Sequence, residues 1–86
     1  MTIAKNDLRC DGLIKYNDIE KNKDNGILCA GKNNFTRIEK NTAISNNRRA
    51  GIKAVEGASI SILKNKIFSN FAQGILLVER TNAYIE

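Results

Sequence analysis

The amino-acid sequence predicts an all-β solenoid, and three observations predict it. An Asn-x-apolar-x-x-Asn tract occurs at residues 17–22, 41–46 and 65–70, with starts 24 residues apart. A Gly-Ile pair opens a short apolar run at 26–30, 51–55 and 74–78, in phase with the first landmark. Isoleucine also recurs at Ile14, Ile38, Ile62 and Ile85. A fixed period in this range is the sequence mark of a repeat architecture.

The elements of each repeat are predicted to be short strands. Ile60-Ser61-Ile62 and Ile52-Lys53-Ala54 alternate with a period of two, which is the period of a strand and not of a helix. The runs are rich in β-branched residues and are bounded by Gly and Asn, which favour turns. We therefore predict a right-handed parallel β-helix, a single-stranded solenoid of about 3.5 coils of 23–25 residues with three strands per coil.

Stacking of the coils predicts which side chains meet in the interior. Successive coils lie about 4.8 Å apart, so residues one repeat apart form columns. The expected inward columns are Ile3, Ile27, Ile52 and Ile75; Ile14, Ile38, Ile62 and Ile85; and Ile19, Ala43 and Ile67. The second inward position of the Gly-Ile strand is expected to hold Lys5, Cys29, Ala54 and Leu77, and Lys5 interrupts that column.

The asparagines at the ends of each tract are expected to be structural. Asn adopts the left-handed backbone conformation that corners need, and stacked Asn side chains bond to one another along a column. We favour this interpretation over a ligand-binding role. The two predicted corner columns are Asn17, Asn41 and Asn65, and Asn22, Asn46 and Asn70.

The tract from Asn65 to Leu77, Asn-x-Ile-x-x-Asn-x-x-x-Gly-Ile-x-Leu, resembles the parallel β-helix repeat of the pectate-lyase-like superfamily. Its short coils and Asn corners are similar to the β-helix domains of carbohydrate-binding proteins and sugar hydrolases. They are also similar to the substrate-recognition domains of F-box-only ubiquitin-ligase adaptors. This resemblance implies the fold, but lyases, hydrolases, epimerases, adhesins and adaptors share the repeat, so it transfers no catalytic residue.

The length predicts one β-helix module over residues 1–86. The repeat is in phase at Thr2 and the last predicted strand, Ala83 to Glu86, ends with the sequence, so no cap is visible at either end. Uncapped coils expose unpaired strand edges, which promote association. We expect the module to be a fragment of a longer solenoid, or to stack end to end with copies of itself.

The cysteines and the hydropathy pattern favour a cytoplasmic location. Cys29 belongs to an inward column, whereas Cys10 aligns with Asn34 and Ala58, so no disulfide is expected between them. Buried free cysteines are typical of a reducing compartment. The sequence shows no signal-peptide pattern and no apolar run of membrane-spanning length.

Enzyme chemistry has few candidates in this sequence. The chain has no histidine, which excludes histidine-dependent catalytic triads. Two carboxylate pairs are candidates for an acid–base or cation site: Asp18 with Glu20 on one strand face, and Glu56 with Glu79 on successive coils. The second pair is the better candidate, but a solvated turn carboxylate that recurs with the repeat is the explanation we favour for it. We therefore assign no catalytic residue, no metal and no cofactor, and favour a non-enzymatic module.

The net charge of +5 raises the question of nucleic acid. No aromatic platform or nucleic-acid motif accompanies the charge, and outward lysines keep a stacked sheet soluble. We therefore do not expect nucleic acid as the partner. The basic candidates are Lys21, Lys23, Arg48 and Arg49, with Lys40 and Lys64 beneath Tyr16 at another corner.

Apolar residues at outward positions predict a docking face for another protein. We therefore predict a non-catalytic β-helix scaffold for protein recognition. The alternative is a polysaccharide-binding or polysaccharide-degrading β-helix, which needs exposed aromatic rings. The available rings are Phe68, Phe71, Tyr16, Tyr84 and Phe35, of which Phe35 fits a place tucked under its turn equally well. The predicted docking residues are Leu28, Leu76, Val55, Val78, Ile44 and Phe68.

Overall fold

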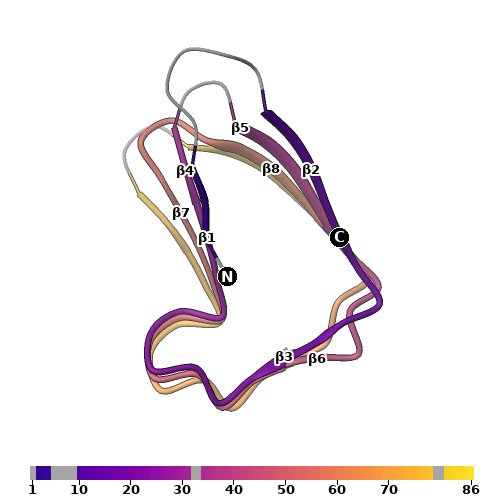
Figure 1. Ribbon diagram of the computed structural model, residues 1–86, viewed down its shortest axis with the longest axis vertical. Helices are drawn as coiled ribbons and strands as arrows, with labels where there is room; N and C mark the ends of the chain where they lie inside the picture. The colour runs from indigo at the N-terminus through magenta and orange to yellow at the C-terminus, as the bar shows by residue number, and fades with distance from the viewer. Residues whose placement is uncertain (1, 5–9, 32–33, 79–80) are drawn as a thin grey trace.

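A computed structural model describes residues 2–4, 10–31, 34–78 and 81–86. Within these ranges the chain forms short strands and turns and no helix. Viewed along the stacking direction, the coils superimpose on one another around a three-sided outline (Figure 1). The strands are β1 (Thr2–Ala4), β2 (Cys10–Lys15), β3 (Asp18–Glu20), β4 (Ile27–Ala30), β5 (Asn34–Glu39), β6 (Ala43–Ser45), β7 (Ile52–Val55), β8 (Ser59–Leu63), β9 (Ile67–Phe68), β10 (Ile75–Leu77) and β11 (Asn82–Ile85).

Three parallel sheets form the three sides of the solenoid. Sheet A has the order β1-β4-β7-β10, sheet B the order β2-β5-β8-β11, and sheet C the order β3-β6-β9. Every recorded strand pair is parallel. Each coil passes through B, C and A in turn, so strands that are neighbours in a sheet are one repeat apart in the sequence. This arrangement is the predicted parallel β-helix.

Stacked isoleucines fill the interior. Ile27 pairs with Ile52 and Ile52 with Ile75 in sheet A, while Ile38 pairs with Ile62 in sheet B. Alternation along each strand sends these side chains inward and their sequence neighbours outward. The buried apolar cluster consists of Ile14, Ile19, Ile27, Cys29, Ile38, Ile44, Ile52, Ala54, Ala58, Ile60 and Ile62.

In the last coil the same positions face inward, but their side chains are less completely buried. Ile75 and Ile67 are half-buried, and Leu77 and Ile85 are 40% and 52% exposed. Their partners one coil earlier are fully buried or nearly so, because those lie between two coils. No described strand lies over β9, β10 or β11, and this accounts for the difference.

At the other end, Ile3 has a different partner from the one predicted. Ile3 pairs with Cys29, not with Ile27, so β1 is displaced by two residues from the expected column. A fixed period of 24 cannot place this strand, because Ile3 and Cys29 are 26 residues apart. Lys5, which was expected to interrupt the column, lies outside the described residues.

One additional residue in the second coil corrects two further predictions. Asn17 stacks on Asn41, 24 residues later, but Ile19 pairs with Ile44, 25 residues later. The additional residue therefore lies between Asn41 and Ile44, where the Thr42 N–H and Oγ both bond to the Asn17 carbonyl.

As a result, Ile44, predicted to face outward, is fully buried between Ile19 and Ile67. Ala43, predicted to face inward, is instead the half-buried outward neighbour. The outward column of sheet C consists of Glu20, Ser45 and Phe68.

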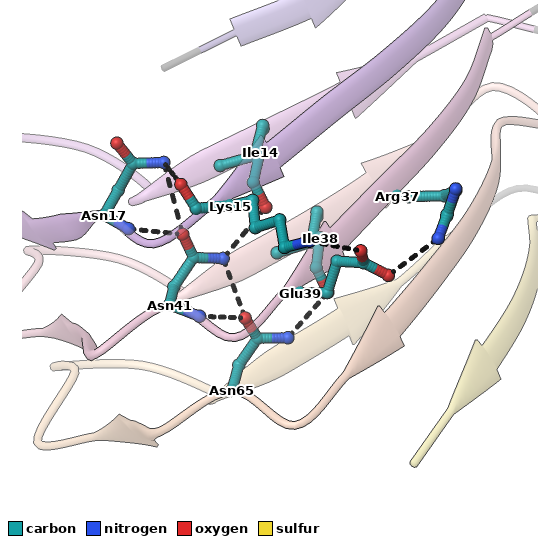
Figure 2. Close-up of polar contacts among 8 residues, drawn as sticks. All are labelled: Ile14, Lys15, Asn17, Arg37, Ile38, Glu39, Asn41 and Asn65. Atoms are coloured by element: carbon teal, nitrogen blue, oxygen red, sulfur yellow. Dashed lines mark hydrogen bonds and ion pairs between the residues drawn. The ribbon is translucent and has the colours of Figure 1, made fainter.

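An asparagine ladder ties the corner between sheets B and C (Figure 2). The Asn41 Oδ1 accepts from the Asn17 backbone N–H at 2.9 Å and from its Nδ2 at 3.3 Å. The Asn41 Nδ2 donates to the Asn65 Oδ1 at 2.7 Å and to the Ile14 carbonyl at 3.1 Å. The Asn65 Nδ2 in turn donates to the Ile38 carbonyl at 2.7 Å. Buried Asn41 is therefore satisfied at both ends of its amide.

A second ladder at the corner leading into sheet A differs from the predicted column by one residue. It consists of Asn22, Asn47 and Asn70, because the additional residue in the second coil moves Asn47 into the position predicted for Asn46. The Asn47 Oδ1 accepts from the Asn22 Nδ2 at 2.8 Å, and its Nδ2 donates to the Asn70 Oδ1 at 2.9 Å. Asn46 is exposed and has a left-handed backbone, with φ of 55°.

Glycine is required where this ladder meets the Gly-Ile run. A Cβ on Gly51 would lie 2.7 Å from the Asn70 Nδ2 and 2.7 Å from the Gly74 carbonyl oxygen. Neither contact is tolerated, because the Asn70 Nδ2 donates to the Ile44 carbonyl and the Gly74 carbonyl accepts from the Ile52 N–H, so both atoms are fixed by the stack. Gly26 meets the same kind of close contacts, so at these two positions the glycine landmark reflects close approach of successive coils.

Cys29 belongs to the buried core. Burial raises the pKa of its thiol to about 11, and a hydrogen bond with the Thr36 side chain offsets part of that increase. The thiol therefore stays protonated at neutral pH. The side chain of Cys10 lies outside the described residues.

We expect Ile62→Asp to unfold the module. The substitution places an unpaired carboxylate between buried Ile38 and the strand above it, at a cost of about 4 kcal/mol or more. Lys53→Asp, on the outward face of β7, should change the free energy of unfolding by less than about 1 kcal/mol. Thermal melts followed by circular dichroism measure both. Equal effects would show that the inside–outside assignment is wrong.

We expect Asn47→Ser to lower the free energy of unfolding by about 3 kcal/mol, because the Asn22 backbone N–H and Nδ2 and the Ile19 carbonyl lose the Asn47 amide as a partner. Asn46→Ser is the matched control. Ser69 occupies the equivalent corner position with φ of 53°, so serine is compatible with that backbone. Urea denaturation of the two variants measures the difference, and a more harmful Asn46→Ser would contradict the ladder.

Cys29 should resist alkylation in the folded protein. At pH 8 a thiol with a pKa of about 11 is almost entirely protonated, and its burial excludes the reagent. Iodoacetamide should modify Cys29 at least about 100-fold more slowly in buffer than in urea. Stability should fall as pH rises from 9.0 toward 11, because the unfolded thiol ionises first. Peptide mass spectrometry separates Cys29 from Cys10, and equal rates in buffer and urea would contradict the burial.

Candidate functional site

An open groove of about 420 Å³ crosses the outer face of sheet B. Its floor is β8, whose outward side chains are the small residues Ser59 and Ser61. Larger outward side chains on the neighbouring strands form its two walls. The walls are Phe35 and Arg37 on β5, and Asn82 and Tyr84 on β11.

Strand register explains why the groove forms there. Phe35 pairs with Ser59 and Ser59 with Asn82, while Arg37 pairs with Ser61 and Ser61 with Tyr84. Each outward column therefore runs from a large side chain through serine to another large or polar one. Since the coils lie about 4.8 Å apart, the strands that carry the walls are about 10 Å apart, which leaves room for one extended chain between the walls.

Ion pairs hold the side chains at one end of the groove (Figure 2). The Arg37 guanidinium lies 3.1 Å from a carboxylate oxygen of Glu39, and the Lys15 Nζ lies 3.8 Å from the other oxygen. On the opposite wall, the Tyr84 hydroxyl donates to the Glu86 carboxylate at 3.1 Å, while the Tyr84 side chain stays 60% exposed. The groove thus offers serine hydroxyls, an amide, a guanidinium and two aromatic rings.

The predicted docking face is not one continuous apolar surface. Leu28 and Leu76 share an outward column of sheet A, but Lys53 lies between them. Val55 and Val78 are half-buried on the same side. Phe68 lies on a different sheet and is half exposed, and Ile44 belongs to the core. The structure therefore divides the predicted residues Leu28, Leu76, Val55, Val78, Ile44 and Phe68 among two faces and the interior.

The candidate carboxylates do not converge with other ligands. Asp18 and Glu20 are exposed on the same face of β3, and the Asp18 carboxylate accepts a short hydrogen bond from the Thr42 hydroxyl. Glu56 has a left-handed backbone at the turn after β7, and Glu79 lies outside the described residues. Among the residues with described positions, no three of His, Cys, Asp and Glu form a group that could hold a metal. The described part of the chain contains no helix that could span a membrane.

The predicted basic residues lie at two corners, and those between sheets C and A divide between the two sides of that corner. Lys21, Lys23 and Arg48 line a hollow beside Phe71, whereas Arg49 faces away and pairs with Asp24 at 3.1 Å. Lys40 and Lys64 follow Tyr16 at the B–C corner, where all three have left-handed backbones.

The sequence interpretation missed the groove, although the signal was present. It treated Phe35 and Tyr84 only as isolated rings and did not consider Ser59, Ser61 or Arg37. Writing the outward residues of sheet B as columns places the two serines between larger side chains. That comparison of side-chain size across coils is the signal that could have found the groove.

Comparison with known families agrees with this architecture. The family model described as a right-handed β-helix region matches residues 6–86. No curated protein and no solved structure matches the chain. Stacked parallel sheets, asparagine ladders and the family match lead to one conclusion: the chain belongs to the right-handed β-helix family.

Proposed function

We propose that this chain is a non-catalytic β-helix scaffold that recognises an extended segment of another protein along the groove of sheet B. The observation that carries the proposal is the serine floor of β8 between walls of larger side chains. A trough between strands about 10 Å apart suits one extended peptide lying along the strands. Small floor residues let its backbone approach the sheet, where hydroxyls can bond to it.

The walls indicate what such a segment would carry. The Phe35 and Tyr84 rings provide apolar contact, and aromatic and Arg side chains are enriched at protein interfaces. Arg37 is held by Glu39 in an exposed position, so its guanidinium is oriented before a ligand binds. We expect a partner segment that combines apolar side chains with a hydrogen-bonding group facing Arg37.

A polysaccharide is the alternative ligand, and one observation favours it. The exposed Tyr84 ring beside two serine hydroxyls and the Asn82 amide is a surface on which a sugar could stack and form hydrogen bonds. The resemblance of the repeat to the pectate-lyase-like superfamily also supports this alternative. With the protein-recognition function we also propose a cytoplasmic location.

Filling the groove tests the proposal. Ser61→Trp places a large ring on the floor without altering an inward position, so we expect protein partners captured from a lysate to be reduced at least about tenfold. Lys53→Trp makes a similar outward change on β7 and should retain them. Quantitative mass spectrometry of the captured proteins measures both variants, with circular dichroism to check folding.

A glycan array completes the experiment. Glycan binding that Ser61→Trp abolishes, without protein partners, would favour the polysaccharide alternative. Equal capture by Ser61→Trp and Lys53→Trp would show that the groove is not the recognition site.

A further inference from the structure

The corner between sheets C and A contains a second hollow, of about 340 Å³. Each coil turns here through a left-handed residue, with φ of 60° at Lys21, 55° at Asn46 and 53° at Ser69. This turn gives the chain a projection beyond the three-sided outline, between the strands of sheet C and those of sheet A (Figure 1). The residues that line the hollow are Lys21, Asn22, Lys23, Asn46, Arg48 and Phe71.

Three residues that line this hollow carry a positive charge. Lys21 and Lys23 lie two residues apart on the first coil. Arg48 lies on the next coil, where its backbone N–H donates to the Asn22 carbonyl at 3.0 Å. Arg48 is therefore about 4.8 Å along the stack from Lys23. All three are exposed, so their charged groups are available to a ligand.

The neighbouring carboxylates are occupied elsewhere. The Glu20 Oε2 accepts from the Ser45 hydroxyl at 3.5 Å, and Asp24 pairs with Arg49 at 3.1 Å. In the described part of the chain, no carboxylate forms an ion pair with Lys21, Lys23 or Arg48. Lys23 and Arg48 are only one coil apart, so their like charges repel one another, and a bound anion relieves that repulsion.

The third coil shows what kind of anion fits. The column that begins with Lys23 and Arg48 continues with Phe71. The Phe71 N–H donates to the Asn47 carbonyl, which places Phe71 over Arg48. The Phe71 side chain is 78% exposed. A nucleic acid or a sulfated polymer needs a continuing track of cations for its repeated charges. Here the track stops at an aromatic ring. The geometry suits one strongly charged group with an apolar neighbour.

We propose that this corner binds a phosphorylated side chain of a partner protein, with its phosphate among Lys21, Lys23 and Arg48 and an adjacent apolar side chain against Phe71. A phosphoryl group carries close to two negative charges at neutral pH and three acceptor oxygens, and Arg binds it through two parallel hydrogen bonds. The site is separate from the groove of sheet B. It does not require that groove to bind protein.

Nuclear magnetic resonance of the ¹⁵N-labelled chain tests the proposal. The probes are a degenerate nonapeptide pool with phosphoserine at its centre, the same pool with serine, and inorganic phosphate at constant ionic strength. We expect phosphate and the phosphorylated pool to shift amide signals of residues 21–23, 46–48 and 71. The pool with serine should leave these signals unchanged.

Two double variants with the same net charge provide the control. Lys23→Gln with Arg48→Gln should weaken binding of the phosphorylated pool at least about tenfold. Lys64→Gln with Lys66→Gln removes two exposed cations from other positions and should change binding less than about twofold.

Several results would overturn the proposal. These are equal losses in the two double variants, shifts spread over all lysines, or no shifts at the corner. Tighter binding of a single-stranded oligonucleotide or a heparin oligosaccharide than of the phosphorylated pool would also overturn it. Failure here leaves the groove proposal intact, because Ser61→Trp tests a different face.

Discussion

The direct stacking of one coil on the next determines most of this structure. Strands satisfy their backbone groups in the coils above and below, and so do the turns. The Gly26 N–H donates to the Ala50 carbonyl at 3.0 Å and the Gly51 N–H to the Gln73 carbonyl at 3.0 Å. Corner asparagines extend the same pattern to side chains. A buried polar group is costly without a partner, so each position is constrained by the residue one coil away.

This constraint explains why the fold could be predicted from the sequence. Inward positions such as Ile27, Ile52 and Ile75 must fit one another, so the same residue type recurs at the repeat distance. Gly26 and Gly51 precede two of them because successive coils approach closely at that turn. Repetition of this kind is visible in one sequence without any relatives.

The same reasoning failed where the period changed. The spacing of 25 between Gly26 and Gly51 showed that the second coil has an additional residue, but not where it lies. The prediction aligned residues 41–46 with residues 17–22 at a constant spacing of 24, and this alignment placed Ile44 at an outward position. A check on burial would have corrected this, since placing the insertion before Ile44 brings a large apolar side chain into the core and Asn47 into the ladder.

Outward positions are much less predictable. Stacking requires only that an outward side chain be compatible with its neighbours, so residue types vary from coil to coil. Ser61 lies between Arg37 and Tyr84 with no repeat to mark it, and the groove depends on that difference in size. Lys53 separates Leu28 from Leu76 for the same reason. Functional surfaces on a solenoid are thus found by comparing coils, not by finding what they share.

The positions of the two candidate surfaces limit how they could work together. The groove lies on sheet B, and the basic corner lies in the turns between sheets C and A, on the opposite side of the outline (Figure 1). Among the described residues, the stacked isoleucine core lies between them. A short peptide therefore cannot occupy both surfaces at once. Two ligands could bind together, one on each surface, so the two proposals are independent of one another.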